Sequence, residues 1–306
     1  MYKKFEILFI LILVVGIGFL LRARLRETYE SWQRASIQSS LPQAQSYAEV
    51  QQLQNINDGE VQNVDEVTNA TSNAPAETTQ KNLETEQLNT LEFANESAMP
   101  QEQTTQDTTE IKKPNAIIPE SINLAVPFTS QAPYANWALP YQEACEEAAA
   151  LMVHAFYTNL TLDPARADKK ILDLVDFQEQ YYGFYKDTTA QETARFIQDL
   201  WGYTNVRVEP AKIETIKAAL TQGFPVMIPA AGRMLGNPYF TGEGPLYHML
   251  VIRGYTKDDN FITNDPGTKR GEGYVYKAST LMNAIHDWNN GNVESGEKLM
   301  IIIEPN

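Results

Sequence analysis

The stretch VPFTSQAPYANWALPYQEACEEAAALM, residues Val126–Met152, decides how the second half of the chain is interpreted. It holds Cys145, the only cysteine of the protein. The residues that follow, Glu146–Met152, have the composition of the start of a helix. A thiol at a helix N-terminus lies at the positive end of the helix dipole, which favours the reactive thiolate. The alternative is a buried cysteine that packs as a small hydrophobe.

The composition excludes several classes of protein. The 306 residues carry a formal net charge of −15, and binding to nucleic acid needs a basic face, so no nucleic-acid partner is expected. A single cysteine excludes an intramolecular disulfide. The three histidines and the cysteine show no ligand spacing, so we expect neither a metal nor another cofactor.

The N-terminus carries an unbroken apolar run, Ile7–Leu21, with Lys3 and Lys4 before it and the basic segment 22–26 after it. The run is short for a membrane span and close in length to a signal-peptide core, but no small residues follow it as a cleavage site would require. We expect residues 1–34 to be an uncleaved signal anchor, a single pass through the cell membrane. Basic residues on both sides leave the orientation open, and the low lysine content of the next segment favours an extracytoplasmic catalytic domain.

Residues 35–113 are rich in Gln, Asn, Thr, Ser, Ala and Glu and show no sustained apolar period. Such a segment cannot bury enough surface to offset the entropy lost on ordering. We therefore expect a disordered acidic stalk here, followed by one folded domain over residues 114–306.

Apolar residues recur at helical spacing mainly in the first part of the domain, and apolar runs typical of strands are found mainly in the later part. The expected helices are 144–157, 164–182, 189–201, 213–222 and 279–288. The expected strands are 123–128, 206–208, 224–229, 246–255, 261–264, 273–276 and 299–303. Helices first and strands later predict an α+β domain.

A nucleophilic thiol needs a base, a group that orients the base, and donors for the oxyanion. His248, at the start of a predicted strand, is the candidate base, and Asp265 closes the following strand. A simple hairpin centred on Asp258 and Asp259 would place Asp265 nearer Ile252, so contact with His248 requires a twist or bend. Spacing alone does not establish a triad.

Four motifs together resemble the C-39-like peptidase family: Val126–Gln131, Cys145 opening a helix, His248–Tyr255 and Asn264–Pro266. That family is related to the bacterial peptidases that process bacteriocin leaders and, more distantly, to papain-like cysteine peptidases. The resemblance covers about residues 120–305. It implies a papain-like fold, with a helical N-terminal half packed on an antiparallel sheet, and a thiol peptidase acting on a peptide or protein substrate as a monomeric domain.

The same resemblance implies a role for each matching residue. Cys145 would be the nucleophile, His248 the general base and acid, and Asp265 the group that orients the imidazole. Gln131 would donate to the oxyanion, with Gln142 as a weaker alternative because the gap between Gln131 and Cys145 is long.

The chain departs from the family where Glu146 follows the cysteine, a position that often holds glycine. Glu146 and Glu147 should raise the pKa of the thiol unless His248 is protonated. A catalytically inactive peptide- or wall-binding module and an acyl transferase of the same fold are therefore kept as alternatives to hydrolysis.

Further residues are candidates for contact with substrate. Tyr134, Trp137 and Tyr247, with the glycine-rich loop 231–245, could form a groove and a flap, although core packing explains Trp137 equally well. His154 lies on the far side of its helix from Cys145 and is expected to be structural or at the surface. His286 is expected on the solvated face of the last helix.

Overall fold

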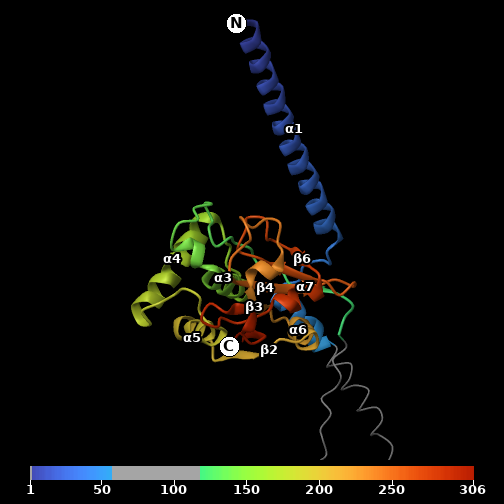
Figure 1. Ribbon diagram of the computed structural model, residues 1–306. Helices are drawn as coiled ribbons and strands as arrows, with labels where there is room; N and C mark the ends of the chain where they lie inside the picture. The colour runs from blue at the N-terminus through green and yellow to red at the C-terminus, as the bar shows by residue number, and fades with distance from the viewer. Residues whose placement is uncertain (1, 57–117) are drawn as a thin grey trace, which may run out of the picture. The chain divides into compact units, whose positions relative to one another are not determined.

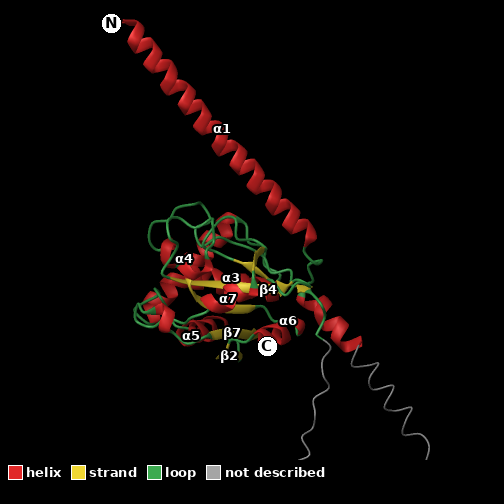
Figure 2. Cartoon of the chain, turned by 45° about the vertical axis from the view of Figure 1, so that its right-hand side comes forward, coloured by secondary structure: helices red, strands yellow, loops and turns green. Residues whose placement is uncertain are grey.

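The computed structural model of the chain describes residues 2–56 and 118–306 and shows seven strands in one antiparallel sheet (Figures 1 and 2). The strands are β1 (Ile122–Asn123), β2 (Asn205–Pro210), β3 (Val226–Ala231), β4 (Tyr247–Tyr255), β5 (Phe261–Asn264), β6 (Tyr274–Tyr276) and β7 (Leu299–Glu304). Their order is β2-β7-β3-β4-β5-β6, and β1 pairs with β4. Strand β4 is buried along its whole length, as its apolar run predicts.

The helices follow the predicted order along the domain. They are α1 (Tyr2–Ser40), α3 (Cys145–Thr158), α4 (Pro164–Tyr181), α5 (Ala190–Trp201), α6 (Ile213–Thr221) and α7 (Ala278–Ala284), with short 3-10 turns at Tyr141–Glu143, Gly232–Leu235 and Val293–Ser295. Thr189 and Glu192 form the capping box that starts α5, and Asp163 caps α4 through Ala165 and Arg166. The α+β prediction is confirmed in this coarse form.

Two predicted elements are shorter in the structure than expected. The strand expected over 123–128 is only Ile122–Asn123, because the chain then turns into an irregular loop whose carbonyls bind side chains. The helix expected to reach 288 ends at Ala284, where the following segment pairs with β3 through a bridge between Ala230 and Ile285.

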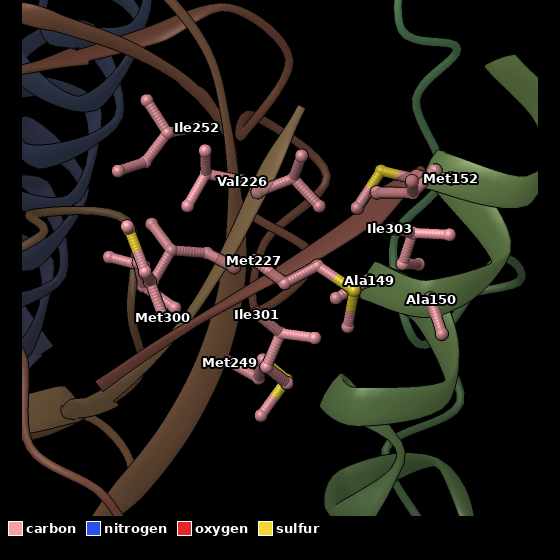
Figure 3. Close-up of a cluster of buried hydrophobic side chains, with 14 of the residues drawn as sticks. Ala149, Ala150, Met152, Val226, Met227, Met249, Ile252, Met300, Ile301 and Ile303 are labelled. Carbon is pink, nitrogen blue, oxygen red and sulfur yellow. The ribbon is translucent and has the colours of Figure 1, made fainter. Parts of the chain in front are cut away.

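Helix α3 is the central packing element. Ala149 and Met152 face the sheet, where Met227, Met249 and Ile303 fill the space between the two layers (Figure 3). All five side chains are fully buried. The small alanines let the helix approach the sheet closely, so Cys145 at its N-terminus is held firmly against β4.

The hairpin of β4 and β5 is irregular. Tyr255 pairs with Phe261, but past a bulge at Arg253 the pairing shifts so that Val251 lies opposite Asn264. Extending this register by one residue places Asp265 opposite Leu250 rather than Ile252. The turn and the bulge together therefore supply the bend that the sequence argument required.

The predicted stalk is wrong in its first part. Residues 35–40 complete α1, and 47–56 are helical. Gln45 bonds the backbone of Asn123 and Ala125, and Val50 lies in the core with only 3% of its surface exposed. The sequence argument failed because it weighed mean composition, whereas a few apolar side chains are enough to dock a short segment on an existing core. The remainder of the stalk, 57–113, lies outside the described residues.

The C-terminal part of α1 also contacts the domain. Glu30 forms an ion pair with Arg270 at 3.1 Å, and Arg34 and Arg270 both lie over the ring of Tyr239. Most side chains of the predicted anchor, Ile7–Leu21, lie outside the described part. Within that part, no helix combines the length and the apolar character needed to cross a membrane.

Candidate active site

His248 and Asp265 form a buried pair at the start of β4. The imidazole Nε2 lies 2.7 Å from Oδ1 of Asp265, and both side chains are almost fully enclosed. The ring of Phe240 packs edge-on against the imidazole at 5.4 Å between centroids. With Nε2 held by the carboxylate, Nδ1 is the ring atom left for proton transfer.

Two further side chains hold the second oxygen of Asp265. Asn237 donates to Oδ2 at 3.0 Å and Tyr276 at 2.7 Å, while the Gly267 N–H donates to Oδ1 at 3.0 Å. Burial by itself would raise the pKa of Asp265, but the charge and hydrogen bond of His248 together with these donors outweigh it, and the pKa lies below the usual value. Asp265 is therefore an ionised group that can stabilise an imidazolium.

Cys145 is the first residue of α3 and lines the same cleft as His248. The backbone N–H of Met249, the residue after His248, lies close enough to lower the pKa of the Cys145 thiol, which places the thiol beside the start of β4. The thiol donates at 3.0 Å to Oε2 of Glu146. Among the described residues it has no hydrogen bond to the imidazole.

The surroundings disfavour the thiolate in this state. Burial, and then the charges of Glu146 and Glu147, raise the pKa of the Cys145 thiol well above its usual value, and only the Met249 N–H lowers it. This is the direction expected from the sequence for two carboxylates beside the thiol. Both carboxyls are themselves buried, and burial raises the pKa of Glu146 to about 7 and the pKa of Glu147 well above its usual value.

Gln131 is held in place by the turn that follows β5. Its N–H and the Ser130 hydroxyl both donate to the carbonyl of Pro266. The side-chain Nε2 donates to the carbonyls of Tyr141 and Gln142, at 2.9 and 3.1 Å, and Oε1 is buried without a hydrogen-bond partner among residues 2–56 and 118–306. Both amide N–H groups are thus occupied, and donation to an oxyanion requires one of these bonds to open. Gln142, the alternative donor, bonds Glu143 instead.

These residues surround a cleft of about 700 Å³. Trp137 and Leu246 line it and are each more than two-fifths exposed, so they present apolar surface at its mouth. Tyr247 also lines the cleft, but its hydroxyl is bound to the Thr188 carbonyl and to Asp287. Tyr134 is 62% exposed and is not among the lining residues.

A sequence profile of the peptidase C39-like family matches residues 123–293, more than half of the chain. The chain belongs to the peptidase C39-like family. This confirms the resemblance inferred from the four motifs and supports a cysteine-peptidase-like function. None of the curated proteins matches the chain significantly.

Two solved structures are similar to this family member in fold. One is a Bacillus anthracis protein whose crystal structure is assigned to the C39-like peptidases, with 16% identity, a TM-score of 0.41, and coverage of 61% of this chain and all of that one. The other is a fragment of prointerpain A from Prevotella intermedia, with 16% identity, a TM-score of 0.31, and coverage of 45% of this chain and 41% of that one.

Sequence reasoning missed the residues that support the pair in this C39-like peptidase. Asn237 and Tyr276 come from a loop and a short strand, and no spacing rule connects either to Asp265. The carboxyl of Glu146 was expected beside the thiol but not as its hydrogen-bond partner. Across residues 2–56 and 118–306, no cluster of His, Cys, Asp and Glu could hold a metal ion.

The other two histidines lie apart from the cleft. His154 stacks on Trp201 at 4.2 Å and bonds the Tyr203 hydroxyl at 2.9 Å, which confirms its structural role. His286 follows α7 rather than lying on it, so its expected place on a helix is wrong. Its ring bonds the Gly296 carbonyl at 2.9 Å because the chain has already turned toward β7.

Proposed function

We propose that the protein is a thiol peptidase that cleaves peptide bonds through an acyl-enzyme on Cys145. The observation that carries the proposal is the buried pair of His248 and Asp265 in the cleft that holds the only cysteine. His248 acts as acid toward the leaving amine and as base toward the water that hydrolyses the acyl-enzyme. Asp265 holds the imidazole in the required tautomer.

Two donors are available for the tetrahedral oxyanion. The Cys145 N–H opens α3, and no described backbone carbonyl accepts from it. It therefore adds a hydrogen bond and the helix dipole at the reacting carbon. Gln131 is the second donor, once one of its two carbonyl partners is released. Trp137 and Leu246 offer apolar contact to substrate side chains at the mouth of the cleft.

Replacement of the nucleophile tests this function. The full-length protein should cleave members of a mixed peptide library, read by mass spectrometry, and react with an E-64-type epoxide at Cys145. The Cys145→Ala protein should do neither. Cleavage that persists in Cys145→Ala would overturn the proposal. Products that gain added glycinamide in place of water would show acyl transfer instead of hydrolysis.

An inactive binding module is the second candidate, favoured by the raised pKa of the thiol. In that case iodoacetamide would label Cys145 no faster than it labels free cysteine near neutral pH. Peptide binding without turnover, measured by calorimetry with library peptides, would be the positive sign of such a module.

We also propose that Ile7–Leu21 anchors the protein in the cell membrane with the domain on the extracytoplasmic side. The basis is the apolar run and its basic flanks. Full-length protein should stay in the membrane fraction after alkaline carbonate extraction, and a chain that starts at residue 27 should be released. Protease digestion of sealed cells would test the side on which the domain lies.

A further inference from the structure

Glu146 is an unusual group to find beside a candidate nucleophile. Only 1% of its surface is exposed, and both of its oxygens are engaged. Oε2 accepts from the Cys145 thiol at 3.0 Å, and Oε1 accepts from the Thr188 N–H at 3.0 Å. The Thr188 carbonyl is held in turn by the Tyr247 hydroxyl at 2.9 Å. The carboxyl is thus fixed with one oxygen aimed at sulfur.

Among the residues that the structure describes, no cation forms an ion pair with this carboxyl. The described residues that face it are Cys145 and Glu147 from α3, Asp187 and Thr188 from the segment before α5, and Tyr247 from β4. None of them is basic, and Glu146 takes part in none of the ion pairs within the described ranges. A buried carboxylate without a cation binds a proton readily.

The nearest proton is that of the thiol. Burial raises the pKa of Glu146 to about 7, so near neutral pH the carboxyl can both take and release a proton. The pKa of Glu147 is also raised well above its usual value, mainly by burial and then by the charge of Glu146. In this state the proton of the 3.0 Å contact lies on Sγ, and Oε2 is placed to accept it.

We propose that Glu146 is a catalytic residue that accepts the Cys145 thiol proton when the thiolate forms and returns it when the thiolate is released. The inference rests on the proposed peptidase function and deepens it. It changes the part of His248, which then enters the reaction as an imidazolium stabilised by Asp265 and has no need to deprotonate the thiol.

The proton balance closes over one turnover. In acylation the S–H bond breaks, its proton goes to Oε2 of Glu146, and sulfur attacks the carbonyl carbon. The imidazolium of His248 then protonates the leaving amine as the C–N bond breaks. In deacylation His248 takes a proton from water, the hydroxide attacks the thioester, and the released thiolate recovers its proton from Glu146. Enzyme and charges return to their starting state.

The alternative interpretation of this contact predicts the opposite effect of removing Glu146 on the reactivity of Cys145. If Glu146 were only a fixed negative charge, it would hold the thiol protonated, and its removal would make Cys145 more reactive. If Glu146 is the proton acceptor, its removal leaves the thiol without a base at hydrogen-bond distance. Substitution by glutamine separates the two because it keeps the shape and removes both the charge and the basicity.

The test compares Glu146→Gln with Glu147→Gln in the full-length protein. Glu147 is the matched control because it is the next residue, equally buried, and bonded to Gln178 rather than to the thiol. Near neutral pH we expect Glu146→Gln to slow both iodoacetamide alkylation of Cys145 and peptide hydrolysis by about 10²-fold. Glu147→Gln should slow neither, because it removes a charge that raises the pKa of the thiol but no hydrogen-bond partner of the thiol. Alkylation of Glu146→Gln at or above the wild-type rate would overturn the inference.

A second measurement needs only the wild-type protein. The rate of alkylation should rise with pH to a plateau whose midpoint is the pKa of Glu146, about 7, because only the ionised carboxyl accepts the thiol proton. A rate that shows no such midpoint and keeps rising toward the pKa of the thiol would overturn the inference even if Glu146→Gln did not fold. Failure of the peptidase function is recognised separately, because alkylation reports on the thiol whether or not any peptide is cleaved.

Discussion

At the scale of single residues, Glu147 makes the stability of the protein depend on pH. Its carboxyl is fully buried, Gln178 donates to Oε1 at 2.5 Å, and Oε2 has no hydrogen-bond partner within the described part of the chain. The folded-state pKa is raised, so the native protein keeps a proton that the unfolded chain releases above its ordinary pKa. The stabilisation is complete below that unfolded-state pKa and is lost as the pH rises toward the folded-state pKa.

We therefore expect the free energy of unfolding to fall by about 1.4 kcal/mol per pH unit through Glu147 alone in this window. Glu147→Gln should remove that part of the slope, because an amide keeps the bond to Gln178 and does not titrate. Urea denaturation at a series of pH values measures it, with Glu143→Gln on the neighbouring turn as control. A Glu147→Gln protein with the wild-type slope would contradict this account.

The residues of the candidate site were predictable to different degrees. Cys145, His248 and Asp265 were expected from motifs, and the structure brings His248 and Asp265 into contact. Asn237 and Tyr276 could not be expected, because their bonds to Asp265 depend on a loop and a strand whose relative position is set only by the folded sheet. The sequence showed which residue types were present, and the packing decides which of them meet.

At the scale of elements, the turn after β5 is the part that assembles the site. Asp265 starts it, the Pro266 carbonyl receives the bonds that hold Gln131, and the Gly267 N–H returns to Asp265. Turn chemistry in Asn264–Gly267 was visible in the sequence, and the strand ending at Asn264 was predicted correctly. The bulge in β4 was not, since no residue pattern in a buried apolar strand marks where the register shifts.

Gly267 is the residue of this turn that a side chain would damage most directly. An added Cβ would lie 2.9 Å from Cε1 of His248 and 2.8 Å from Cε1 of Phe240. Gly267→Ala should therefore push the imidazole away from its position and lower peptide hydrolysis by about 10²-fold, with a smaller effect on folding. Gly18→Ala, in the helix α1, where a Cβ meets nothing within 4 Å, is the control. Hydrolysis by Gly267→Ala at the wild-type rate would show that the imidazole tolerates the shift.

At the scale of the whole molecule, the domain draws on residues from both sides of the segment 57–117. The order of helices and strands after residue 144 was predictable because each has its own apolar period and its own end signals. The contribution of 41–56 was not, because Tyr47 and Val50 stand in a polar stretch and the rings that pack against Tyr47, those of Phe156, Tyr157 and Phe224, come from distant parts of the chain. Long-range packing of this kind leaves no local pattern.

The packing of 41–56 on the core predicts that a chain of residues 118–306 is less stable than a chain that includes 41–56. Loss of 41–56 uncovers the sites of Tyr47 and Val50 and breaks the bonds that Gln51 and Gln54 donate to the end of α6. Full burial of a large apolar side chain contributes about 1.5–3 kcal/mol, and Val50 is buried while Tyr47 is only partly so. The shorter chain should therefore lose about 2–4 kcal/mol of stability relative to residues 41–306. Thermal and urea unfolding of the two chains measure the difference.

A synthetic peptide of residues 41–56 should restore part of the lost stability when added to the shorter chain, whereas a peptide with Tyr47 and Val50 replaced by alanine should not. Equal stability of the two chains would mean that 41–56 rests on the surface without supporting the core.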